Sequence, residues 1–263
     1  MMIEFSKYEG TGNDFIILDN REGMYSSITK EQVAFLCNRH FGIGADGLML
    51  LQLKEGYDFE MIYFNADGGE GSMCGNGGRC LTAYAKKLDV IKYKAHFFAS
   101  DGDHNATINE TGNIELKMKD VTDVERYKDY CVLNTGSPHY IQWVTDTKTV
   151  DVVKEGKAIR YGERFGKVGI NVNFVQVQPT HLTVRTYERG VEDETLSCGT
   201  GVTASAIAAA NETKDQQEIS VITSGGQLSV KFKRTGNSSF TDIWLCGPAK
   251  FVFEGSINLT SLK

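Results

Sequence analysis

Two cysteines in this chain occur in the same short pattern, Cys-Gly-x-Gly followed by an alanine-rich run. Cys74 lies in M-C-G-N-G-G-R-C, and Cys198 lies in S-C-G-T-G-V-T. The alanine-rich runs predict that each cysteine stands just ahead of a helix. The positive end of a helix dipole lowers the pKa of a nearby thiol and favours bound anions. We therefore expect two reactive thiols that serve one substrate.

Four kinds of chemistry use a pair of thiols: a zinc site, a redox disulfide, a nucleophile with a resolving cysteine, and a pair of acid/base groups. Zinc takes four ligands, commonly with cysteines about two to four residues apart. Here Cys74 and Cys80 are six positions apart, and no histidine cluster lies nearby. A redox pair would usually read C-x-x-C, which the chain lacks. A lone nucleophile does not explain a second cysteine in an equivalent motif.

Two acid/base groups on opposite sides of one carbon explain both cysteines. Inversion of a stereocentre requires removal of a proton from one face and delivery of a proton to the other. A thiolate and a thiol can do this when both titrate near the working pH, and each turnover exchanges their states. Amides at two helix N-termini would stabilise the charge that spreads onto the neighbouring carboxylate. We expect this chemistry to need no metal and no other cofactor.

The cysteine motif belongs to a longer internal repeat. Cys74 and Cys198 are 124 positions apart, and the same offset aligns further segments of small residues. The aligned pairs are Thr11-Gly12 with Thr135-Gly136, Ser100 and Gly102 with Ser224 and Gly226, and T-G-N at 111–113 with T-G-N at 235–237. Anchors in one order and one register indicate two halves of one ancestral unit rather than coincidence among common residues.

The repeat predicts two similar domains, which suits a chain of 263 residues. We expect an α/β (α+β) fold with a pseudo-twofold relation, in which each domain wraps a strongly curved, mostly antiparallel sheet around a central helix. The helix after Cys198 is apolar on all sides, as is typical of a helix buried within a domain. The predicted domains are 1–121, joined by a C-terminal strand near 252–263, and 122–251.

Local patterns predict individual elements. Thr29 is a candidate N-cap with Gln32 at the reciprocal capping position, ahead of a helix that ends near 40–42. The segment Gly42–Gly47 reads G-x-G-x-x-G, but a helix precedes it and an apolar strand follows at 48–53. A dinucleotide fingerprint requires the opposite order, so we interpret these glycines as a turn. Further strands are predicted at 3–8, 16–19, 59–64, 95–99, 105–108, 114–118, 131–133, 140–144, 171–177 and 182–187.

Composition and charge exclude several classes of protein. The chain is 41% hydrophobic and 24% charged, which is ordinary for a globular protein. Its formal net charge of −6, without a basic stripe, argues against a nucleic-acid partner. No apolar run approaches the roughly 18 residues of a membrane span, and no signal peptide is visible. Six cysteines are too few for a disulfide scaffold, so we expect a cytoplasmic protein.

The chain resembles the cofactor-independent diaminopimelate epimerases over nearly its whole length. The matching motifs follow the family's order and read G-T-G-N-D-F, R-H-F-G-I-G-A-D-G, F-N-A-D-G, M-C-G-N-G-G-R-C, G-S-P-H, N-V-N-F-V-Q-V, Y-E-R-G and S-C-G-T-G. The resemblance implies interconversion of LL- and meso-2,6-diaminopimelate on the route to lysine and peptidoglycan. It also implies two domains that face each other across an active-site cleft, a homodimer, and no cofactor.

The same resemblance implies roles for particular residues. Cys74 and Cys198 would be the acid/base thiols, and His139 and Glu188 would tune their ionisation. The residues implied to hold the substrate by side chain or backbone amide are Asn13, Asn65, Gly75, Asn76, Asn171, Glu188, Arg189, Gly199 and Thr200. Arg189 suits a carboxylate because its planar fork can donate two parallel hydrogen bonds.

Three features depart from the commoner family pattern. Ser137 stands where many members have asparagine, so a substrate contact there would be shorter or lost. Gly47 stands where some members have glutamine, so no side-chain contact is expected. The segment between Tyr187 and Cys198 is one residue longer than the usual spacing, which alters the loop before the second thiol.

Three alternative functions remain. The related proline and hydroxyproline racemases also use two opposed cysteines, but they resemble M-C-G-H-G where this chain has M-C-G-N-G. A further related isomerase lacks the cysteine pair, which the presence of Cys74 and Cys198 opposes. A catalytically silent binding protein on the same scaffold is the alternative from a different class. The other cysteines, Cys37, Cys80, Cys131 and Cys246, are expected to be buried core residues.

Overall fold

The structure is a computed structural model that describes residues 2–71 and 73–259. The chain divides into two compact units. Unit 1 contains the described residues up to Leu116 and from Pro248 onward, and unit 2 spans Lys117–Gly247. The sequence predicted the crossings at 121/122 and near 252. Whether each unit is an independent functional half stays a prediction.

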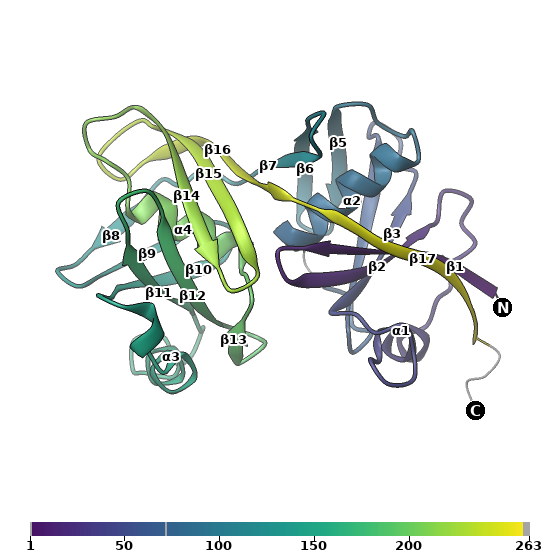
Figure 1. The fold of residues 1–263 in the computed structure, drawn as a ribbon, viewed down its shortest axis with the longest axis horizontal. Coiled ribbons are helices and arrows are strands. Elements are labelled where there is room, and N and C mark those ends of the chain that lie inside the picture. The colour runs from purple at the N-terminus through teal and green to yellow at the C-terminus, as the bar shows by residue number, and fades with distance from the viewer. Residues whose placement is uncertain (1, 72, 260–263) are drawn as a thin grey trace. The chain divides into compact units, whose positions relative to one another are not determined.

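Unit 1 is a sheet of short strands with two helices (Figure 1). Its elements are β1 Met2–Gly10, β2 Asn13–Asp19, α1 Lys30–Cys37, β3 Gly47–Gln52, β4 Phe59–Asn65, α2 Gly75–Lys87, β5 Lys94–Ala99, β6 Gly102–Ile108, β7 Asn113–Lys117 and β17 Lys250–Asn258. The pairings β1–β17, β1–β2, β3–β4, β5–β6 and β6–β7 are antiparallel, and β2–β3 and β4–β5 are parallel.

Unit 2 repeats this plan. Its elements are β8 Val124–Arg126, β9 Tyr130–Asn134, β10 Pro138–Trp143, the short 3-10 helix η1 Thr147–Thr149, α3 Val152–Arg160, β11 Asn171–Val177, β12 Leu182–Glu188, β13 Asp193–Thr195, α4 Gly199–Ala208, β14 Gln216–Thr223, β15 Gly226–Arg234 and β16 Phe240–Pro248. The pairings β10–β11 and β12–β14 are parallel, and the other pairings are antiparallel. The predicted fold class, with mostly antiparallel curved sheets, is confirmed.

Strand register carries the sequence repeat into the structure. Phe15 of β2 stands opposite Gly47 of β3, and adding 124 to each number yields the pair His139 and Asn171 of β10 and β11. The hairpin pair Ala99 and Gly102 likewise becomes Thr223 and Gly226. Strand β12 is the exception, because it matches β4 at an offset of 123. The one-residue difference is made up in the loop before Cys198, which is one residue longer than the loop before Cys74.

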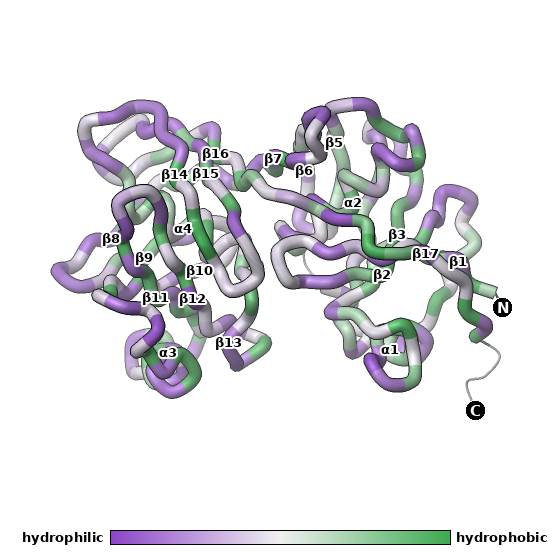
Figure 2. The backbone as a smooth tube through the Cα atoms, in the orientation of Figure 1, coloured by the Kyte–Doolittle hydropathy of each residue, from purple (hydrophilic) through white to green (hydrophobic). Residues whose placement is uncertain are grey.

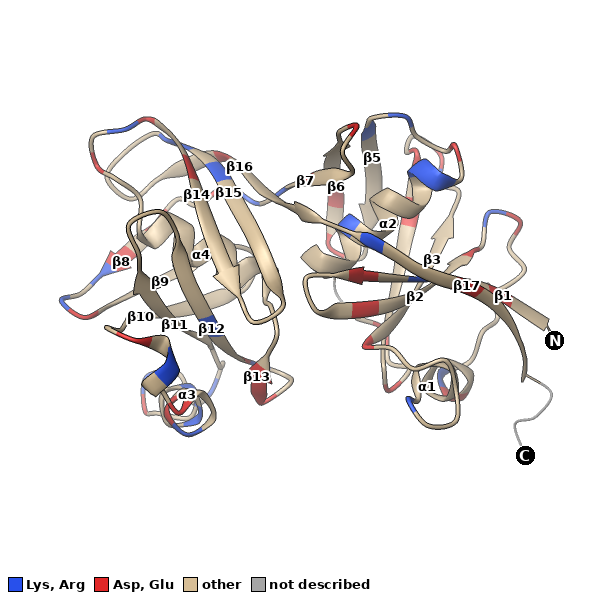
Figure 3. Ribbon diagram, viewed as in Figure 1, with Lys and Arg blue, Asp and Glu red and all other residues tan. Residues whose placement is uncertain are grey.

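Each unit holds one central helix. Helix α2 packs against β1, β2, β3 and β6, and α4 packs against β9, β10, β11, β12, β14 and β15. Helix α4 reads G-T-G-V-T-A-S-A-I-A, and nine of its residues are buried. It therefore carries no charged residue and is tan throughout in Figure 3, whereas charges of both signs lie on other elements.

The other helix of each unit covers the sheet through an apolar face. In unit 1, Val33 and Leu36 of α1 pack with Ile16 and Leu48 of the sheet. In unit 2, Val152 of α3 packs in a cluster with residues that include Val172 and Phe174. Figure 2 shows both hydrophobic (green) and hydrophilic (purple) stretches along α1 and α3. Burial of these side chains contributes about 1.5–3 kcal/mol for each large aliphatic group.

The predicted start of α1 and the turn after it are both observed. Thr29 Oγ1 accepts from the Gln32 amide at 3.3 Å, and Gln32 Oε1 accepts from the Thr29 amide at 2.9 Å, so the capping box is complete. The segment Gly42–Gly47 joins α1 to β3. A Cβ atom on Gly42 would stand 2.0 Å from the Phe35 carbonyl oxygen, so the close return of the chain requires glycine there. Within the described residues, no helix is long and apolar enough to span a membrane.

Candidate active site

Cys74 and Cys198 occupy the same local position in the two units. Cys74 is the N-cap of α2 and Cys198 is the N-cap of α4, both with extended backbone angles. The Cys74 carbonyl accepts from the Gly78 amide at 2.7 Å, and the Cys198 carbonyl accepts from the Val202 amide at 2.8 Å. Each thiol therefore stands at the positive end of a buried helix, as the sequence predicted. Cys74 is half-buried and Cys198 is buried.

The residues after each cysteine begin the helix. Gly75-Asn76 and Gly199-Thr200 are the first two residues of α2 and α4. The amides in the first turn of an α-helix have no carbonyl four residues earlier within the helix to bond. They form a site that suits a carboxylate or a developing oxyanion. Gly75, Asn76, Gly199 and Thr200 thus stand where the resemblance requires, and their contact with substrate stays a prediction.

In unit 1, two predicted substrate-binding asparagines meet beside the cysteine motif. Asn76 Nδ2 donates to Asn13 Oδ1 at 2.5 Å, and Thr11 Oγ1 donates to Asn76 Oδ1 at 3.4 Å. Asn13 Nδ2 donates in turn to Asp46 Oδ2 at 3.0 Å. The two asparagine side chains are therefore held in one orientation by groups on three separate segments of the chain.

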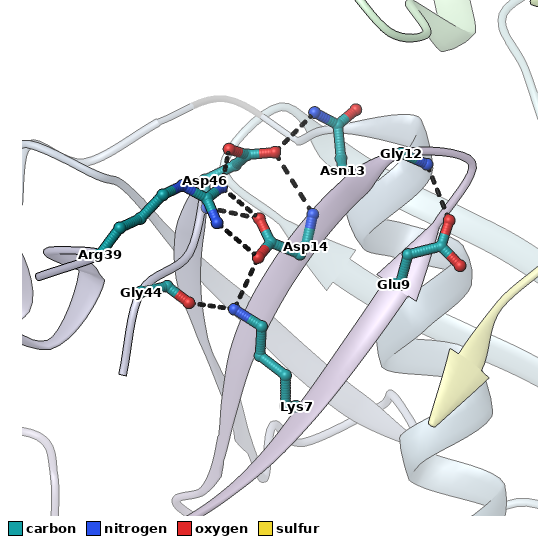
Figure 4. A network of polar contacts seen from close by, with 8 residues as sticks. All are labelled: Lys7, Glu9, Gly12, Asn13, Asp14, Arg39, Gly44 and Asp46. Carbon is teal, nitrogen blue, oxygen red and sulfur yellow. Dashed lines mark hydrogen bonds and ion pairs between the residues drawn. The ribbon is translucent and has the colours of Figure 1, made fainter. Parts of the chain in front are cut away.

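Behind Asn13 lies a network of ion pairs (Figure 4). Arg39 Nη2 donates to Asp14 Oδ1 and to Asp46 Oδ1, each at 2.7 Å. Lys7 Nζ lies 2.8 Å from Asp14 Oδ2 and also bonds the Gly44 carbonyl. Burial raises the pKa of Asp14, but the hydrogen bonds from Arg39 and Lys7 outweigh it and lower this pKa to about 2. Asp46 is thereby fixed against the cation, and it holds the Asn13 amide.

Asn65 and Glu188 end equivalent strands. Asn65 is the last residue of β4 and stands opposite Gly47 in the sheet, with its side chain exposed. Gly47 itself is closely packed, since a Cβ atom there would lie 2.5 Å from Tyr63. Glu188 is the last residue of β12 and accepts from Thr195 Oγ1 at 2.9 Å. Burial raises the pKa of Glu188, while the Thr195 hydrogen bond partly opposes this rise.

In unit 2, hydrogen-bond contacts link Cys198 to Thr200 and Thr200 to His139. Thr200 Oγ1 lies 3.5 Å from the Cys198 sulfur and 2.9 Å from His139 Nε2. His139 is fully buried, and Asn173 Nδ2 lies 3.0 Å from its Nδ1. Burial, together with the nearby Arg189 cation, lowers the pKa of His139 to about 3. The imidazole is therefore neutral at physiological pH.

A second polar group in unit 2 gathers Ser137, Asn171 and Arg189. Asn171 Nδ2 donates to Ser137 Oγ at 2.9 Å, and Asn171 Oδ1 accepts from the Arg189 amide at 2.9 Å. The Arg189 guanidinium donates to Ser137 Oγ at 3.5 Å and to the Val168 carbonyl at 3.1 Å. The hydroxyl of Ser137 thus accepts from both side chains, and substrate binding by Asn171 and Arg189 stays a prediction.

The remaining cysteines fill the core. Cys37, Cys80, Cys131 and Cys246 are buried, as predicted. Burial strongly raises the pKa of Cys80 and keeps this thiol protonated. Over residues 2–71 and 73–259, no group of three or more His, Cys, Asp or Glu side chains is arranged to hold a metal ion.

Comparison with known proteins decides the family. The family described as diaminopimelate epimerase matches the chain over residues 5–124 and 131–252. The chain belongs to the diaminopimelate epimerase family. The predicted family and the predicted enzyme class, an isomerase of the epimerase type, are thereby confirmed.

Relatives of the same name cover almost the whole chain. A diaminopimelate epimerase from Flavobacterium psychrophilum is 53% identical over 253 residues, which span 95% of this chain and 98% of the relative. The diaminopimelate epimerase of Chlorobaculum tepidum is 40% identical over 260 residues, which span 95% of this chain and 99% of the relative. That of Aquifex aeolicus is 36% identical over 278 aligned positions, and the alignment covers 97% of this chain and 98% of the relative.

Solved structures of low sequence identity share the fold of this diaminopimelate epimerase family member. A Bacillus anthracis phenazine biosynthesis protein of the PhzF family aligns with a TM-score of 0.72 at 15% identity and covers 98% of this chain and 100% of its own. A hydroxyproline epimerase from Agrobacterium vitis, with bound trans-4-hydroxy-L-proline, aligns with a TM-score of 0.69 at 14% identity over 99% and 94%. At these identities the likeness extends to the fold alone.

The sequence analysis of this epimerase family member missed several residues that contact the predicted site residues. Asn173 and Thr195 contact the predicted residues His139 and Glu188, and Asp46 holds Asn13. Asn173 carried a usable signal, because residues two apart on a strand share a face and Asn171 was already a candidate. The partnership of Thr195 with Glu188 had no sequence signal, since it depends on the pairing of β12 with β13.

Proposed function

We propose that this protein interconverts LL- and meso-2,6-diaminopimelate by two-base proton transfer between Cys74 and Cys198. The observation that carries the proposal is the equivalent placement of the two cysteines, each as the N-cap of a buried helix in a repeated unit. Relatives that are 53% and 40% identical and span nearly the whole chain bear the name diaminopimelate epimerase, which supports this substrate.

The proposed reaction balances without an oxidant or reductant. The thiolate of one cysteine removes the α-hydrogen as a proton, and the C–H electron pair moves onto the adjacent carboxylate. The thiol of the other cysteine then delivers its proton to the opposite face of the same carbon. The product has inverted configuration, and the two sulfurs have exchanged protonation states. The first-turn amides of α2 and α4 stabilise the charge on the carboxylate.

The polar groups beside the thiols supply the proposed binding contacts. In unit 2, Arg189 presents its guanidinium beside Ser137 and Asn171, and it can bind a carboxylate through two hydrogen bonds. Glu188, whose pKa burial raises, is the last residue of β12 and precedes Arg189, and we propose that it binds substrate and tunes thiol ionisation. In unit 1, the Asn13–Asn76 pair offers amide groups, and Asn65 offers an exposed side chain.

Proton exchange at the α-carbon tests this function. The purified protein is incubated in D₂O with LL-diaminopimelate and, separately, with L-proline and trans-4-hydroxy-L-proline, and deuterium uptake and inversion are followed by NMR. We expect exchange and inversion of diaminopimelate alone. Exchange of proline or hydroxyproline alone would assign the chain to the racemase alternative, and no exchange with any of the three would favour the silent binding protein.

The physiological context forms part of the proposal. A diaminopimelate epimerase supplies meso-diaminopimelate for lysine and peptidoglycan synthesis, and we propose this role in the cytoplasm without a metal or other cofactor. Assay after dialysis against a strong chelator tests the last point, and activity that is lost and then restored by a metal would contradict it.

The homodimer is also proposed. On β17, Phe251, Val252 and Phe253 are 47%, 53% and 45% exposed, and adjacent exposed apolar residues are typical of an interface. Light scattering of the purified protein should return twice the chain mass of 29.1 kDa. A mass of one chain at micromolar concentration would contradict the homodimer and would leave the proposed reaction untouched.

A further inference from the structure

A line of hydrogen bonds runs from the sheet of unit 2 to the sulfur of Cys198. Asn173 on β11 contacts His139 on β10, His139 contacts Thr200 in the first turn of α4, and Thr200 contacts Cys198. Asn173 and His139 are both fully buried. The direction in which each group donates decides whether the last group of the line favours a thiol or a thiolate.

The Asn173 amide is oriented by a group that can only accept. One of its terminal atoms lies 3.2 Å from the backbone carbonyl oxygen of Tyr140, so that atom is the nitrogen Nδ2. Its other terminal atom, Oδ1, accepts from Thr186 Oγ1 at 2.9 Å. The same Nδ2 lies 3.0 Å from His139 Nδ1. Since Nδ2 donates, His139 Nδ1 must accept and carries no proton.

The orientation of Asn173 then sets every later step. A neutral imidazole without a proton at Nδ1 carries its proton at Nε2, and the lowered pKa of His139 keeps the ring neutral. The Nε2–H group donates to Thr200 Oγ1 at 2.9 Å. The hydrogen of the Thr200 hydroxyl is thus directed to its remaining neighbour in this line, the Cys198 sulfur at 3.5 Å.

The equivalent positions of unit 1 lack this line. Subtracting 124 from His139 and Asn173 gives Phe15 and Met49, which are apolar and buried. The residue equivalent to Thr200 is Asn76, whose amide donates to Asn13. The repeated units thus share the helix and the thiol, but the positions of His139 and Asn173 are occupied by apolar side chains in unit 1.

We propose that Asn173 is a positioning residue that sets the tautomer of His139 and thereby makes the Thr200 hydroxyl a hydrogen-bond donor to Cys198. A donated hydrogen bond stabilises a thiolate more than a thiol. This hydrogen bond therefore raises the fraction of Cys198 that is thiolate, the form in which Cys198 acts as the base on the epimer whose α-hydrogen faces its sulfur. This assignment rests on the proposed function in one respect only, namely that both cysteines are acid/base groups.

The first experiment reads the tautomer directly. Nitrogen-15 NMR of labelled protein distinguishes bare from protonated ring nitrogens, and we expect His139 to be protonated at Nε2 and bare at Nδ1. In Asn173→Asp, an ionised carboxylate can only accept a hydrogen bond from the ring. We therefore expect the tautomer of His139 that is protonated at Nδ1 and bare at Nε2. Thr186→Val is the matched control, because it removes a buried hydroxyl from the same group but leaves the Asn173 Nδ2 bonds in place, so the wild-type tautomer should persist. A wild-type ring protonated at Nδ1 would overturn the proposal.

The second experiment reads the sulfur. In a Cys74→Ala background, ultraviolet thiolate absorbance at matched pH reports the thiolate-to-thiol ratio of Cys198. Thr200→Val should lower this ratio roughly tenfold or more, because it removes a hydrogen bond to a charged group. Thr200→Ser keeps the hydroxyl, so its thiolate-to-thiol ratio should stay close to that of Thr200. A ratio that is unchanged in Thr200→Val would overturn the proposal even if Asn173→Asp fails to fold.

These measurements use no substrate, so their outcome is separate from that of the diaminopimelate assay. If exchange on diaminopimelate fails while the tautomer and the thiolate ratio behave as expected, the substrate assignment is wrong and the line of donors stands. If exchange succeeds while Thr200→Val leaves the thiolate ratio unchanged, the reaction stands and the role of Asn173 is wrong.

Discussion

A Cβ atom on Gly201 would stand 2.3 Å from Oδ1 of Asn173. At the equivalent position of unit 1, a Cβ atom on Gly77 would stand 3.1 Å from the sulfur of Met49. The Asn173 amide is held by hydrogen bonds to Tyr140 and Thr186 and cannot move without breaking them. The Met49 thioether is flexible and can give way. The two glycines are alike in sequence but differ in what a methyl group would displace.

Gly201→Ala should therefore destabilise the protein much more than Gly77→Ala. We expect Gly201→Ala to lower the free energy of unfolding by roughly 1–3 kcal/mol, as overpacking of a filled core does. Gly77→Ala should stay within about 1 kcal/mol of wild type, because alanine's better helix propensity offsets a mild contact. Urea denaturation of both variants provides the measurement. Equal losses in the two variants would contradict the close packing of α4 on Asn173.

Cys74→Ala and Cys198→Ala should each abolish epimerisation while the fold is kept. Each variant removes the only proposed acid/base group on one face of the carbon, and such groups typically contribute about 10²–10⁴-fold in rate. Turnover above about a hundredth of the wild-type value in either variant would contradict the two-base mechanism. Cys246→Ala is the matched control: this cysteine is also buried in unit 2, but it belongs to the core and its loss should leave turnover intact.

The Asp14 network should make unit 1 sensitive to acid. The pKa of Asp14 is about 2 in the folded protein and 3.8 ordinarily, because Arg39 and Lys7 outweigh the effect of burial. A lowered folded-state pKa stabilises the fold above the ordinary value, and this contribution is lost as the pH falls from about 4 to about 2. The shift is worth roughly 2 kcal/mol.

Asp14→Asn tests this dependence. The free energy of unfolding is measured by urea denaturation at several pH values between 2 and 6. The variant should be less stable than wild type at pH 6, and the difference should narrow as the pH approaches 2. A difference that stays constant with pH would show that the carboxylate charge of Asp14 is not what stabilises the network.

The sequence was sufficient for elements whose signal is local. The alternating run N-V-N-F-V-Q-V predicted a strand over 171–177, and β11 has those bounds. Thr29 and Gln32 predicted the start of α1, since a capping box lies within four residues. Both cysteines were predicted as helix N-termini from the glycines and alanines that follow them. In each of these examples the deciding contacts lie within one turn or one strand.

Helix α3 was not predicted from the sequence, because its formation depends on tertiary packing. Its sequence V-V-K-E-G-K-A-I-R has a glycine at its centre, which disfavours a helix in isolation. In the structure a Cβ atom on Gly156 would lie 2.4 Å from the Tyr187 Cβ, so glycine permits the close approach of α3 to β12. Asp151 caps the helix by accepting from the Lys154 amide. The repeat offers a signal, since adding 124 to the bounds of α1 gives 154–161, which overlaps α3.

The hydrogen-bond partners of the site residues also could not be predicted from local sequence patterns. Asn173 reaches His139 because β11 pairs in parallel with β10, and Asp46 reaches Asn13 because the turn before β3 returns to β2. Such contacts join residues more than 30 positions apart and depend on strand register. The sequence could therefore name candidate groups such as His139, but not the tautomer that its neighbours impose.

Ser137→Ala should weaken substrate binding more than it slows the chemical step. Ser137 Oγ accepts from Asn171 Nδ2 at 2.9 Å and from the Arg189 guanidinium at 3.5 Å. It therefore orients two of the proposed substrate-binding side chains, and neither of these contacts involves a thiol. Loss of a hydrogen bond of this kind costs about 0.5–1.5 kcal/mol. KM for diaminopimelate should therefore rise roughly two- to tenfold while kcat stays within about twofold, the signature of lost uniform binding.

Ser220→Ala is the matched control, because it removes a hydroxyl that accepts from Gln227 on the β14–β15 hairpin. This variant should leave both KM and kcat unchanged. A fall in kcat at constant KM would instead mean that Ser137 acts on the transition state.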